Sequence, residues 1–170
     1  LLPSAISGNP ENRTGVILAK SIPAKKYGVR TGEPVAMALR KCPHLILARP
    51  NFRLYEKNSH DFMAICGRYA PVVEKFSIDE CFLDMSGTQI LYPDPVQVAH
   101  TIKDKIREEL GFTVNVGISR NKLLAKMASD FEKPDKVHTL FPEDIPTKLW
   151  PLPVRELFLV GHTTAEKLER

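Results

Sequence analysis

Residues 71–87 read Pro71-Val-Val-Glu-Lys-Phe-Ser-Ile-Asp-Glu-Cys-Phe-Leu-Asp-Met-Ser-Gly87, two short apolar runs that meet at the adjacent acids Asp79 and Glu80. Both runs are rich in β-branched and aromatic residues, which favour strands. Neighbouring side chains of one straight strand point to opposite faces, so the two acids can serve one site only at a hairpin tip. The stretch therefore predicts two strands joined by a tip at 77–80.

Two carboxylates at such a tip would repel each other. At a separation of about 4 Å the repulsion is roughly 4 kcal/mol near a protein surface, so convergence usually requires a cation or a shared proton. We interpret the tip as a candidate divalent-metal site with Asp79 and Glu80 as ligands. The alternative is a pair of solvated acids on an exposed turn.

The composition is that of a globular protein. The chain has 170 residues, of which 43% are hydrophobic and 26% charged, enough for one sizeable core or two small ones. No apolar run approaches the roughly 20 residues of a membrane span, so we expect a soluble protein without a membrane partner. The chain opens on Leu1-Leu2-Pro3 without a Met or a signal pattern, which suggests a fragment whose N-terminus lies upstream.

The cysteines and the distribution of charge indicate the cellular compartment and the kind of partner. Cys42, Cys66 and Cys81 are odd in number, far apart and set among apolar neighbours, which predicts buried, reduced thiols and a cytoplasmic protein rather than disulfides or a zinc site. The formal charge is +4, but residues 20–41 carry six Lys or Arg against one Glu. Such a local excess suits phosphate contact, and a solvated basic face is the alternative.

The first 50 residues predict short elements. The expected elements are strands over 5–7 and 16–19 joined by a polar turn at 8–15, helices over 23–27 and 34–41, and a strand over 45–48. After Pro50 the pattern changes from short, basic pieces to longer periodic ones. We therefore place a domain boundary at this proline.

The remainder predicts an α+β domain. The expected elements are a helix from 54 to 69 stopped by Pro71, the hairpin, a helix between the Asp94-Pro95 cap and Gly111, a strand over 112–118, a helix capped by Ser119 and ended by Lys133-Pro134, and a strand over 137–141. From 53 to 118 this is the βαββαβ order of a ferredoxin-like split βαβ sheet without its first strand. If that strand lies upstream of Leu1, residues 1–50 are an insertion.

The last segment, 152–170, predicts a short helix, a Val-Gly turn and the start of another helix. This is half of a helix-hairpin-helix element, whose turn amides face a phosphate backbone. A plain helical hairpin is the alternative for this stretch taken alone.

Three motifs occur together in this chain: Ser77-Ile-Asp-Glu80, the run from Val116 to Asp130 that continues into Lys133-Pro134, and Ala24-Lys-Lys-Tyr-Gly-Val29. With them the chain resembles the Y-family translesion DNA polymerases of the bacterial DNA polymerase IV and UmuC-like group, the ImpB/MucB/SamB family. The resemblance implies that residues 1–50 are fingers-like, 51–141 form the palm, and 142–170 begin a helix-hairpin-helix thumb.

The resemblance also implies site residues. Asp79 and Glu80 match the palm carboxylates that hold two Mg²⁺ ions, Lys133 and Lys25 match residues that meet the incoming triphosphate, and Gly161 and His162 match the backbone approach to DNA phosphate. The implied partners are primer–template DNA, deoxynucleoside triphosphates, and a sliding clamp bound through a region outside this fragment.

Some positions depart from the family pattern. Ile22 stands where a tyrosine is common, Lys25 where an arginine is common, and Leu159 where a small residue is usual. Ile22 donates no side-chain hydrogen bond and Lys25 cannot form the bidentate fork of arginine, so nucleotide affinity or selectivity is expected to differ. The family's first palm strand, with another metal-binding aspartate and the ribonucleotide-excluding side chain, would precede Leu1, so we expect these 170 residues alone to be inactive.

The expected function of the full-length protein is template-directed DNA synthesis past lesions by two-metal nucleotidyl transfer. One alternative is a non-catalytic DNA-binding or damage-response scaffold that keeps the polymerase shape. A nucleotide cyclase on a similar sheet is a further alternative, against which the basic first segment and the half helix-hairpin-helix speak.

Overall fold

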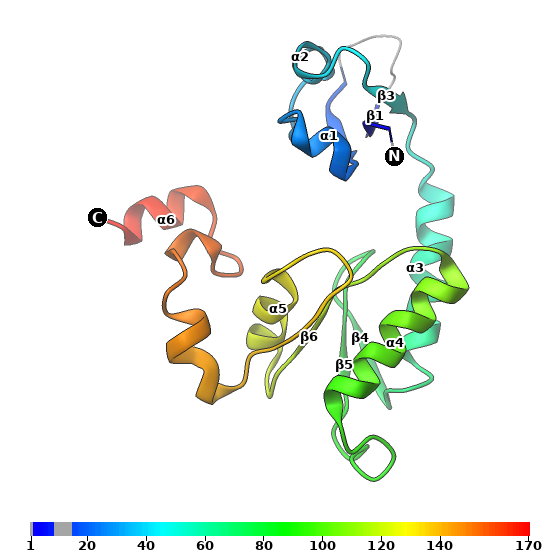
Figure 1. Cartoon of the computed structure of the whole chain (residues 1–170), viewed down its shortest axis with the longest axis vertical. Helices are drawn as coiled ribbons and strands as arrows, with labels where there is room; N and C mark the ends of the chain where they lie inside the picture. Colours follow the sequence, from blue (N-terminus) through cyan, green and yellow to red (C-terminus); the bar gives the residue numbers. More distant parts are fainter. Residues whose placement is uncertain (1, 9–14) are drawn as a thin grey trace. The chain divides into compact units, whose positions relative to one another are not determined.

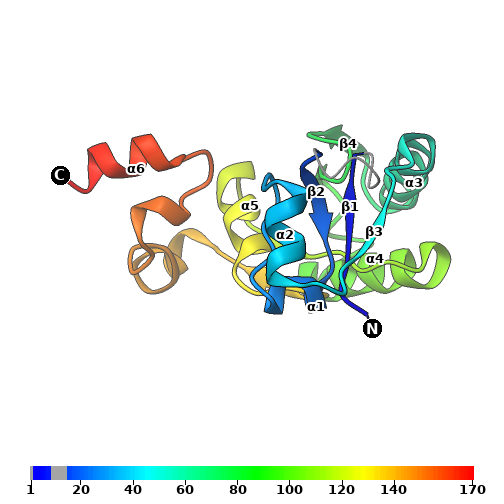
Figure 2. The same cartoon turned by 90° about the horizontal axis from the view of Figure 1, so that it is seen from above.

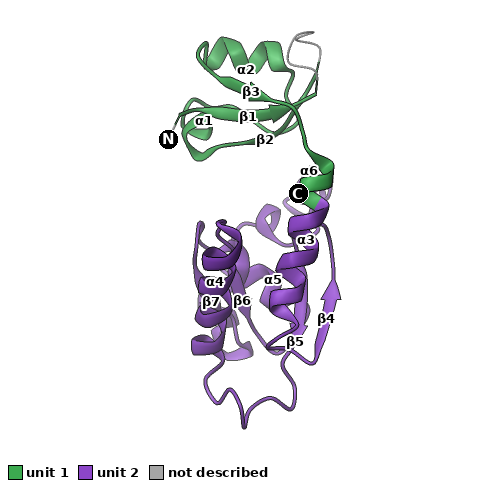
Figure 3. Cartoon of the chain, turned by 90° about the vertical axis from the view of Figure 1, so that its right-hand side faces the viewer, with its two compact units in different colours: residues 1–55 green, residues 56–170 purple. Residues whose placement is uncertain are grey.

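The computed structural model describes residues 2–8 and 15–170, which form two compact units, Leu1–Tyr55 and Glu56–Arg170 (Figure 3). The predicted division into domains at residues 50 and 141 stays a prediction, because compactness alone separates only these two units. Within the described ranges, no helix combines the length and the apolar character needed to cross a bilayer.

The first unit holds a three-stranded sheet of β1 (Ser4–Ser7), β2 (Ile17–Lys20) and β3 (Ile46–Ala48), in the order β2-β1-β3. β1 pairs antiparallel with β2 and parallel with β3. The predicted hairpin is therefore confirmed, although most of its turn, 9–14, lies outside the described residues.

Two short helices, α1 (Ile22–Lys26) and α2 (Val35–Lys41), lie beside these strands (Figure 2). The Ser21 hydroxyl accepts a hydrogen bond from the amide of Ala24 and so caps α1. Small and branched side chains form the core between helices and sheet: Ala5, Ile17, Ala24, Val29, Val35, Ala38, Cys42 and Leu45.

The second unit follows the predicted order of helix, strand, strand, helix, strand (Figure 1). Its elements are α3 (Phe52–Cys66), which begins in the first unit, β4 (Val72–Lys75), β5 (Cys81–Asp84), α4 (Pro95–Leu110), β6 (Val116–Ile118), α5 (Lys122–Asp130) and β7 (Val137–Thr139). β4 and β5 are antiparallel, whereas β6 and β7 are parallel and form a separate ladder.

The core of this unit lies where α3 and α4 pack against the β4–β5 hairpin. It is built from apolar side chains of both helices, Phe62, Ile65, Cys66, Val98, Ile102 and Ile106, with Val73, Cys81 and Leu83 of the strands against them. Cys42 and Cys66 are buried, as predicted, whereas Cys81 is only half-buried, and all three are free thiols.

The ends of α4 lie where the sequence predicts them. The Asp94 carboxylate accepts hydrogen bonds from the amides of Val96 and Gln97, and Pro95 occupies the first helical position. Gly111 ends the helix with φ 76°, a left-handed conformation that glycine adopts without a steric penalty.

Other predicted boundaries were wrong. The predicted strand 112–118 is regular only from Val116, because β6 pairs with just three residues of β7 while Phe112 and Val114 pack into the α3–α4 core. The cap of α5 is Asn121 rather than Ser119, whose hydroxyl donates to the carbonyl of Leu140.

Three elements are also shorter than predicted. Helix α3 stops at Cys66, α5 stops at Asp130, and β7 stops at Thr139. After Cys66, for example, the amides of Arg68 and Tyr69 donate three residues back, to Ile65 and Cys66, which tightens the chain into a turn.

The C-terminal segment packs its apolar side chains against α5. It comprises a 3₁₀ turn (Pro142–Asp144), a π-helical turn (Ile145–Leu149), a second 3₁₀ turn (Val154–Glu156) and α6 (His162–Leu168). The predicted short helix after 152 is thus only a 3₁₀ turn. The residues that pack against the α5 core are Ile145, Leu149, Leu152, Leu157 and Phe158.

Candidate functional site

The predicted hairpin tip is confirmed. Lys75 of β4 pairs with Cys81 of β5, so residues 76–80 form the tip. The amides of Phe76 and Ser77 both donate to the carbonyl of Glu80, at 3.0 Å each. These bonds turn the chain tightly and place Asp79 and Glu80 together at one end of the hairpin.

Asp79 is exposed and is oriented by its own loop. Its Oδ1 accepts a hydrogen bond from the Ser77 hydroxyl at 2.7 Å, and its amide donates to the same hydroxyl oxygen at 3.3 Å. This local turn is typical of Asp and Ser in tight loops. The carboxylate is therefore held at the surface of the tip.

Glu80 is half-buried and reaches α5. Its Oε1 accepts from Lys126 Nζ at 2.5 Å. Lys126 Nζ also lies 3.4 Å from Asp130 Oδ2, and the other oxygen of Asp130 lies 2.6 Å from Lys133 Nζ. We call Glu80, Lys126, Asp130 and Lys133 the ion-pair chain. It connects a predicted metal ligand to a predicted triphosphate contact.

The inner members of the ion-pair chain have shifted pKa values. Burial lowers the pKa of Lys126, but the hydrogen bond to Glu80 and the charge of Asp130 outweigh it, so the pKa lies above its ordinary value. For Asp130, burial raises the pKa, and the ammonium groups of Lys133 and Lys126 lower it by more. Both residues therefore remain ionised at neutral pH.

A glycine in β6 sets the position of α5. A Cβ at Gly117 would lie 1.9 Å from the carbonyl oxygen of Ala125 and 2.5 Å from the amide nitrogen of Ser129, both in α5. These distances exclude any side chain at this position, so only glycine lets the helix approach the strand this closely. The approach fixes the helix that carries Lys126 and Asp130.

Aromatic rings support the two lysines that α5 directs at the hairpin. Lys122 pairs with Glu74 and lies 5.8 Å from the ring centroid of Phe82. Lys126, one turn later, pairs with Glu80 and lies 5.7 Å from the ring centroid of Phe158. Each lysine thus combines an ion pair with a cation–π contact.

A third ring joins the tip to the C-terminal segment. The ring centroid of Phe76 lies 5.6 Å from that of Phe82 and 5.8 Å from that of Phe158. Aromatic pairs at such distances stabilise a fold beyond the area they bury. The rings therefore fasten the segment after residue 142 to the hairpin that carries the acids.

The other predicted site residues lie in separate segments. Lys25 is exposed on α1 of the first unit. Gly161 is the cap residue of α6 and His162 its first residue, both exposed, and His162 Nδ1 lies 3.4 Å from Glu166 Oε1 of the same helix. Leu159, two residues before the cap, is 83% exposed and has φ 65°.

The tip offers two of the oxygen ligands that Mg²⁺ prefers. Among the described residues, no group of three or more His, Cys, Asp or Glu side chains is placed to hold a metal ion. Glu80 already has a cation, the Lys126 ammonium, beside its carboxylate. As carboxylates, Asp79 and Glu80 fit the donor chemistry of a divalent cation, but they are two acids without a third such ligand among the described residues.

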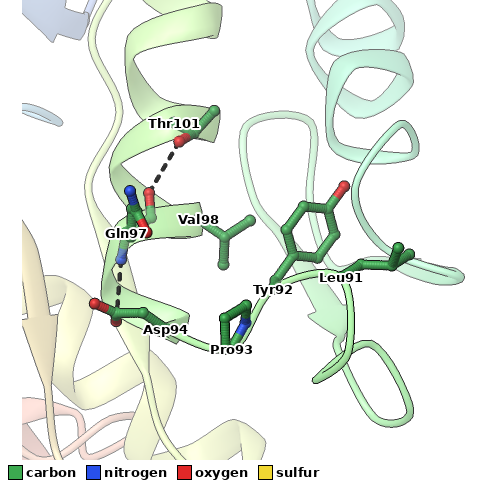
Figure 4. A pocket seen from close by; sticks show the side chains of 7 residues that line it. All are labelled: Leu91, Tyr92, Pro93, Asp94, Gln97, Val98 and Thr101. Carbon is green, nitrogen blue, oxygen red and sulfur yellow. Dashed lines mark hydrogen bonds between the residues drawn. The ribbon is translucent and has the colours of Figure 1, made fainter.

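The second unit has hollows beside α4 and beside the hairpin tip. A pocket of about 100 Å³ lies between the loop at Leu91–Pro93 and the start of α4, where Asp94 is occupied in capping the helix and Thr101 donates to the carbonyl of Gln97 (Figure 4). A larger hollow of about 360 Å³ borders the hairpin tip and is lined by Glu56, Ser59, His60, Met63, Lys75 and Ile78. The Ser59 hydroxyl there is buried without a hydrogen-bond partner among the described residues.

Sequence reasoning missed Lys126 and Asp130 as members of the site. Both belong to the motif between Val116 and Asp130, where they read as the polar face of an amphipathic helix. The available signal was their spacing, because residues at i, i+4 and i+7 share a helix face and Lys133 continues the series beyond the helix. The contact of Lys126 with Glu80, 46 residues earlier, and through Lys126 the link to Asp130, become visible only in the fold.

Residues 2–130 match the impB/mucB/samB family, and residues 142–170 match the HHH motif of the same family. The chain is 51% identical over 167 residues to a DNA polymerase IV of Clostridium acetobutylicum and 45% identical over 166 residues to one of Acetivibrio thermocellus. Each alignment covers 98% of this chain and 42% of the relative, so the chain spans about two fifths of these proteins.

Solved structures agree with this fold. A crystal structure of DinB from Sulfolobus solfataricus matches with a TM-score of 0.88 at 28% identity, covering 98% of this chain and 49% of that one. An insertion ternary complex of Dbh DNA polymerase matches with a TM-score of 0.89 at the same identity and the same two coverages. The predicted α+β, palm-like fold is thereby confirmed.

Proposed function

Because the chain belongs to the impB/mucB/samB family, we propose that it is part of a translesion DNA polymerase that extends a primer along damaged template DNA. The observation that carries this proposal is the β4–β5 hairpin, whose tip presents Asp79 and Glu80 beside the lysines of α5. The relatives named DNA polymerase IV support the same activity. In this proposal residues 1–50 serve as fingers, 51–141 as palm and 142–170 as the start of the thumb.

Asp79 and Glu80 would hold two Mg²⁺ ions together with at least one acid from outside residues 1–170. When bound, the ions supply activation of the primer hydroxyl and neutralisation of the triphosphate charge. The chain's own contribution is to hold two carboxylates at a tight tip, with Ser77 orienting Asp79 and Lys126 orienting Glu80. The rings of Phe76 and Phe82 stiffen that tip.

Lys133 and Lys25 would bind the incoming deoxynucleoside triphosphate. Lys133 is 55% exposed and its Nζ lies 2.6 Å from Asp130, so its ammonium is positioned and accessible. Lys25 is exposed on α1, one turn after Ile22, which is 57% exposed and offers no hydrogen-bond donor. Fewer donors on α1 would weaken the hold on the triphosphate.

Gly161 and His162 would approach the phosphate backbone of primer–template DNA, with a sliding clamp bound through another part of the protein. The match of 142–170 to the HHH motif supports this role. Free cysteines at 42, 66 and 81 suit a reducing, cytoplasmic compartment.

The proposal is tested by changing the acids in the full-length protein. Asp79→Asn and Glu80→Gln should each lower primer extension with Mg²⁺ by roughly a thousandfold or more, because each removes several kcal/mol of charge stabilisation in the transition state. DNA binding, measured by fluorescence anisotropy, should change little. Glu74→Gln is the matched control, since Glu74 lies on the same hairpin but pairs with Lys122.

Two outcomes would contradict the proposal. Near-normal extension by Asp79→Asn would show that these acids are not metal ligands. DNA binding by the wild-type full-length protein without any extension would favour the non-catalytic scaffold. Residues 1–170 alone should extend no primer, because the described residues supply no third metal ligand beside Asp79 and Glu80.

A further inference from the structure

Glu80, Lys126, Asp130 and Lys133 alternate in charge, with two carboxylates and two ammonium groups. We propose that Lys126 is a positioning residue that holds Glu80 until a divalent cation arrives, and that Asp130 then receives the displaced ammonium. The inference rests on the proposed function, in which Glu80 is a metal ligand.

Lys126 lies where such an exchange needs little movement. Its Nζ is 2.5 Å from Glu80 Oε1 and 3.4 Å from Asp130 Oδ2, so both acids are within ion-pair distance of one ammonium. Its side chain is only 13% exposed and lies against the ring of Phe158, which restricts it to this space. A shift of the ammonium by about an ångström makes Asp130 rather than Glu80 its nearer partner. No change in the path of α5 is required.

Charge decides the direction of the exchange. A divalent cation on Glu80 repels an ammonium that contacts the same carboxylate, because like charges within about 4 Å repel strongly at a partly buried site. Asp130 lies on the same face of α5 and carries a full negative charge. It is therefore the acceptor that keeps Lys126 paired after displacement.

Asp130 also couples this event to Lys133. Its Oδ1 contacts Lys133 and its Oδ2 faces Lys126, so the two lysines share one carboxylate. An anion that draws Lys133 away leaves Asp130 to hold Lys126 more strongly, which loosens the hold of Lys126 on Glu80. Binding of a polyphosphate at Lys133 and of a cation at Glu80 should therefore favour each other.

The experiment measures Mn²⁺ affinity of the full-length protein without DNA or nucleotide, from the electron paramagnetic resonance signal of free Mn²⁺. Lys126→Met removes the competing ammonium and should tighten Mn²⁺ binding by about two- to tenfold. Asp130→Asn removes the alternative partner of Lys126 and should weaken binding by a similar factor. A purely structural role would weaken binding in both variants.

Lys122→Met is the matched control. Lys122 lies one turn before Lys126 on α5, pairs with another hairpin acid and also lies over a phenylalanine ring, but does not contact Glu80. Its substitution should leave Mn²⁺ affinity unchanged. Circular dichroism and thermal melting show whether each variant is folded, and Lys126→Gln replaces Lys126→Met if the latter is not.

Unchanged or weaker Mn²⁺ binding by folded Lys126→Met or Lys126→Gln, with wild-type binding intact, would overturn this inference alone. Unchanged binding by Asp130→Asn would remove the role of Asp130. If the wild-type protein shows no Mn²⁺ binding that Asp79→Asn abolishes, the metal site of the proposed function fails as well.

Discussion

Two sets of ion pairs flank the loop at 131–136, and they are built differently. One is the ion-pair chain from Glu80 to Lys133 described above. The other joins α4 to the same loop and consists of Lys103, Asp104, Arg107 and Asp135; we call it the α4 clamp. Each set contains two cations and two carboxylates.

The difference lies in how many partners each charge has. In the α4 clamp both carboxylates contact both cations, at 2.7–3.0 Å, and the Lys103 side chain is only 6% exposed. In the ion-pair chain only Lys126 and Asp130 have two partners, while Glu80 and Lys133 at its ends have one each within the described part of the chain. A closed set stabilises the fold, whereas an open chain leaves its end groups available to ligands.

The largest expected effect concerns the exposed end of the ion-pair chain. Lys133→Met in the full-length protein should lower kcat/KM for nucleotide incorporation by about ten- to a hundredfold, mostly through KM, because a charge-assisted contact to the triphosphate is lost. Steady-state primer extension measures this. Lys136→Met is the control, since Lys136 lies on the same loop and pairs with Glu132. Equal effects of the two substitutions would break the comparison.

The next effect concerns the close contact between Gly117 of β6 and α5. Gly117→Ala should lower the free energy of unfolding by at least about 2 kcal/mol, because its Cβ has no room against Ala125 and Ser129. The displaced helix would also carry Lys126 away from Glu80, so Mn²⁺ affinity should change. Urea unfolding gives the stability, with Gly87→Ala as the comparison at an uncrowded glycine, where only the backbone strain of its φ of 79° applies. A stable Gly117→Ala variant would contradict the close approach.

A smaller effect is expected in the α4 clamp. Lys103→Met should lower the melting temperature of the full-length protein by about 2 to 6 °C, because the ion pairs of its ammonium with Asp104 and Asp135 are lost. The loss is limited because Arg107 still pairs with both acids. Mn²⁺ affinity and KM should remain at wild-type values. A change in either would show that the clamp takes part in ligand binding, and the contrast between the two sets would fail.

The smallest expected effect is the pH dependence of the stability that Asp135 contributes. The hydrogen bond from Lys103 holds the pKa of Asp135 below its ordinary value, against the opposing effect of burial. Such a carboxyl stabilises the fold above its unfolded pKa, and this contribution is lost as the pH falls through the lower, folded pKa. Asp135→Asn should therefore melt below wild type at pH 7, and the difference should shrink below about pH 4. An equal difference at pH 3 would assign the loss to packing.

Local signals predicted much of the fold. The cap at Asp94, the proline at position 95 and Gly111 fix α4 to the residue, because each acts on the backbone beside it. The strand predicted from residue 112 was wrong at its start, because the extent of a strand depends on a partner that is distant in the sequence. Its alternating apolar residues Phe112 and Val114 serve the α3–α4 core, and a partner strand, which is a tertiary feature, is available only from Val116.

The residues of the site also fall into those that local sequence predicts and those that only the fold reveals. A tip at 77–80 follows from two strand-like runs and a short polar connection, so its position was predictable. Ser119 and Asn121 are both good helix caps, and the carbonyl of Leu140, which is 21 residues away from Ser119, decides between them. Lys126 has the same helical signal as Lys122, and only packing shows which of the two faces Glu80.

The ladders of the second unit have a practical consequence. Among the described residues, β4 and β5 pair only with each other, as do β6 and β7, so neither ladder has a further strand along its outer edges. Edge strands can recruit strands from neighbouring molecules and promote aggregation. Preparations of residues 1–170 should therefore cluster with rising concentration, and a short complementary peptide that covers an edge should keep them monodisperse.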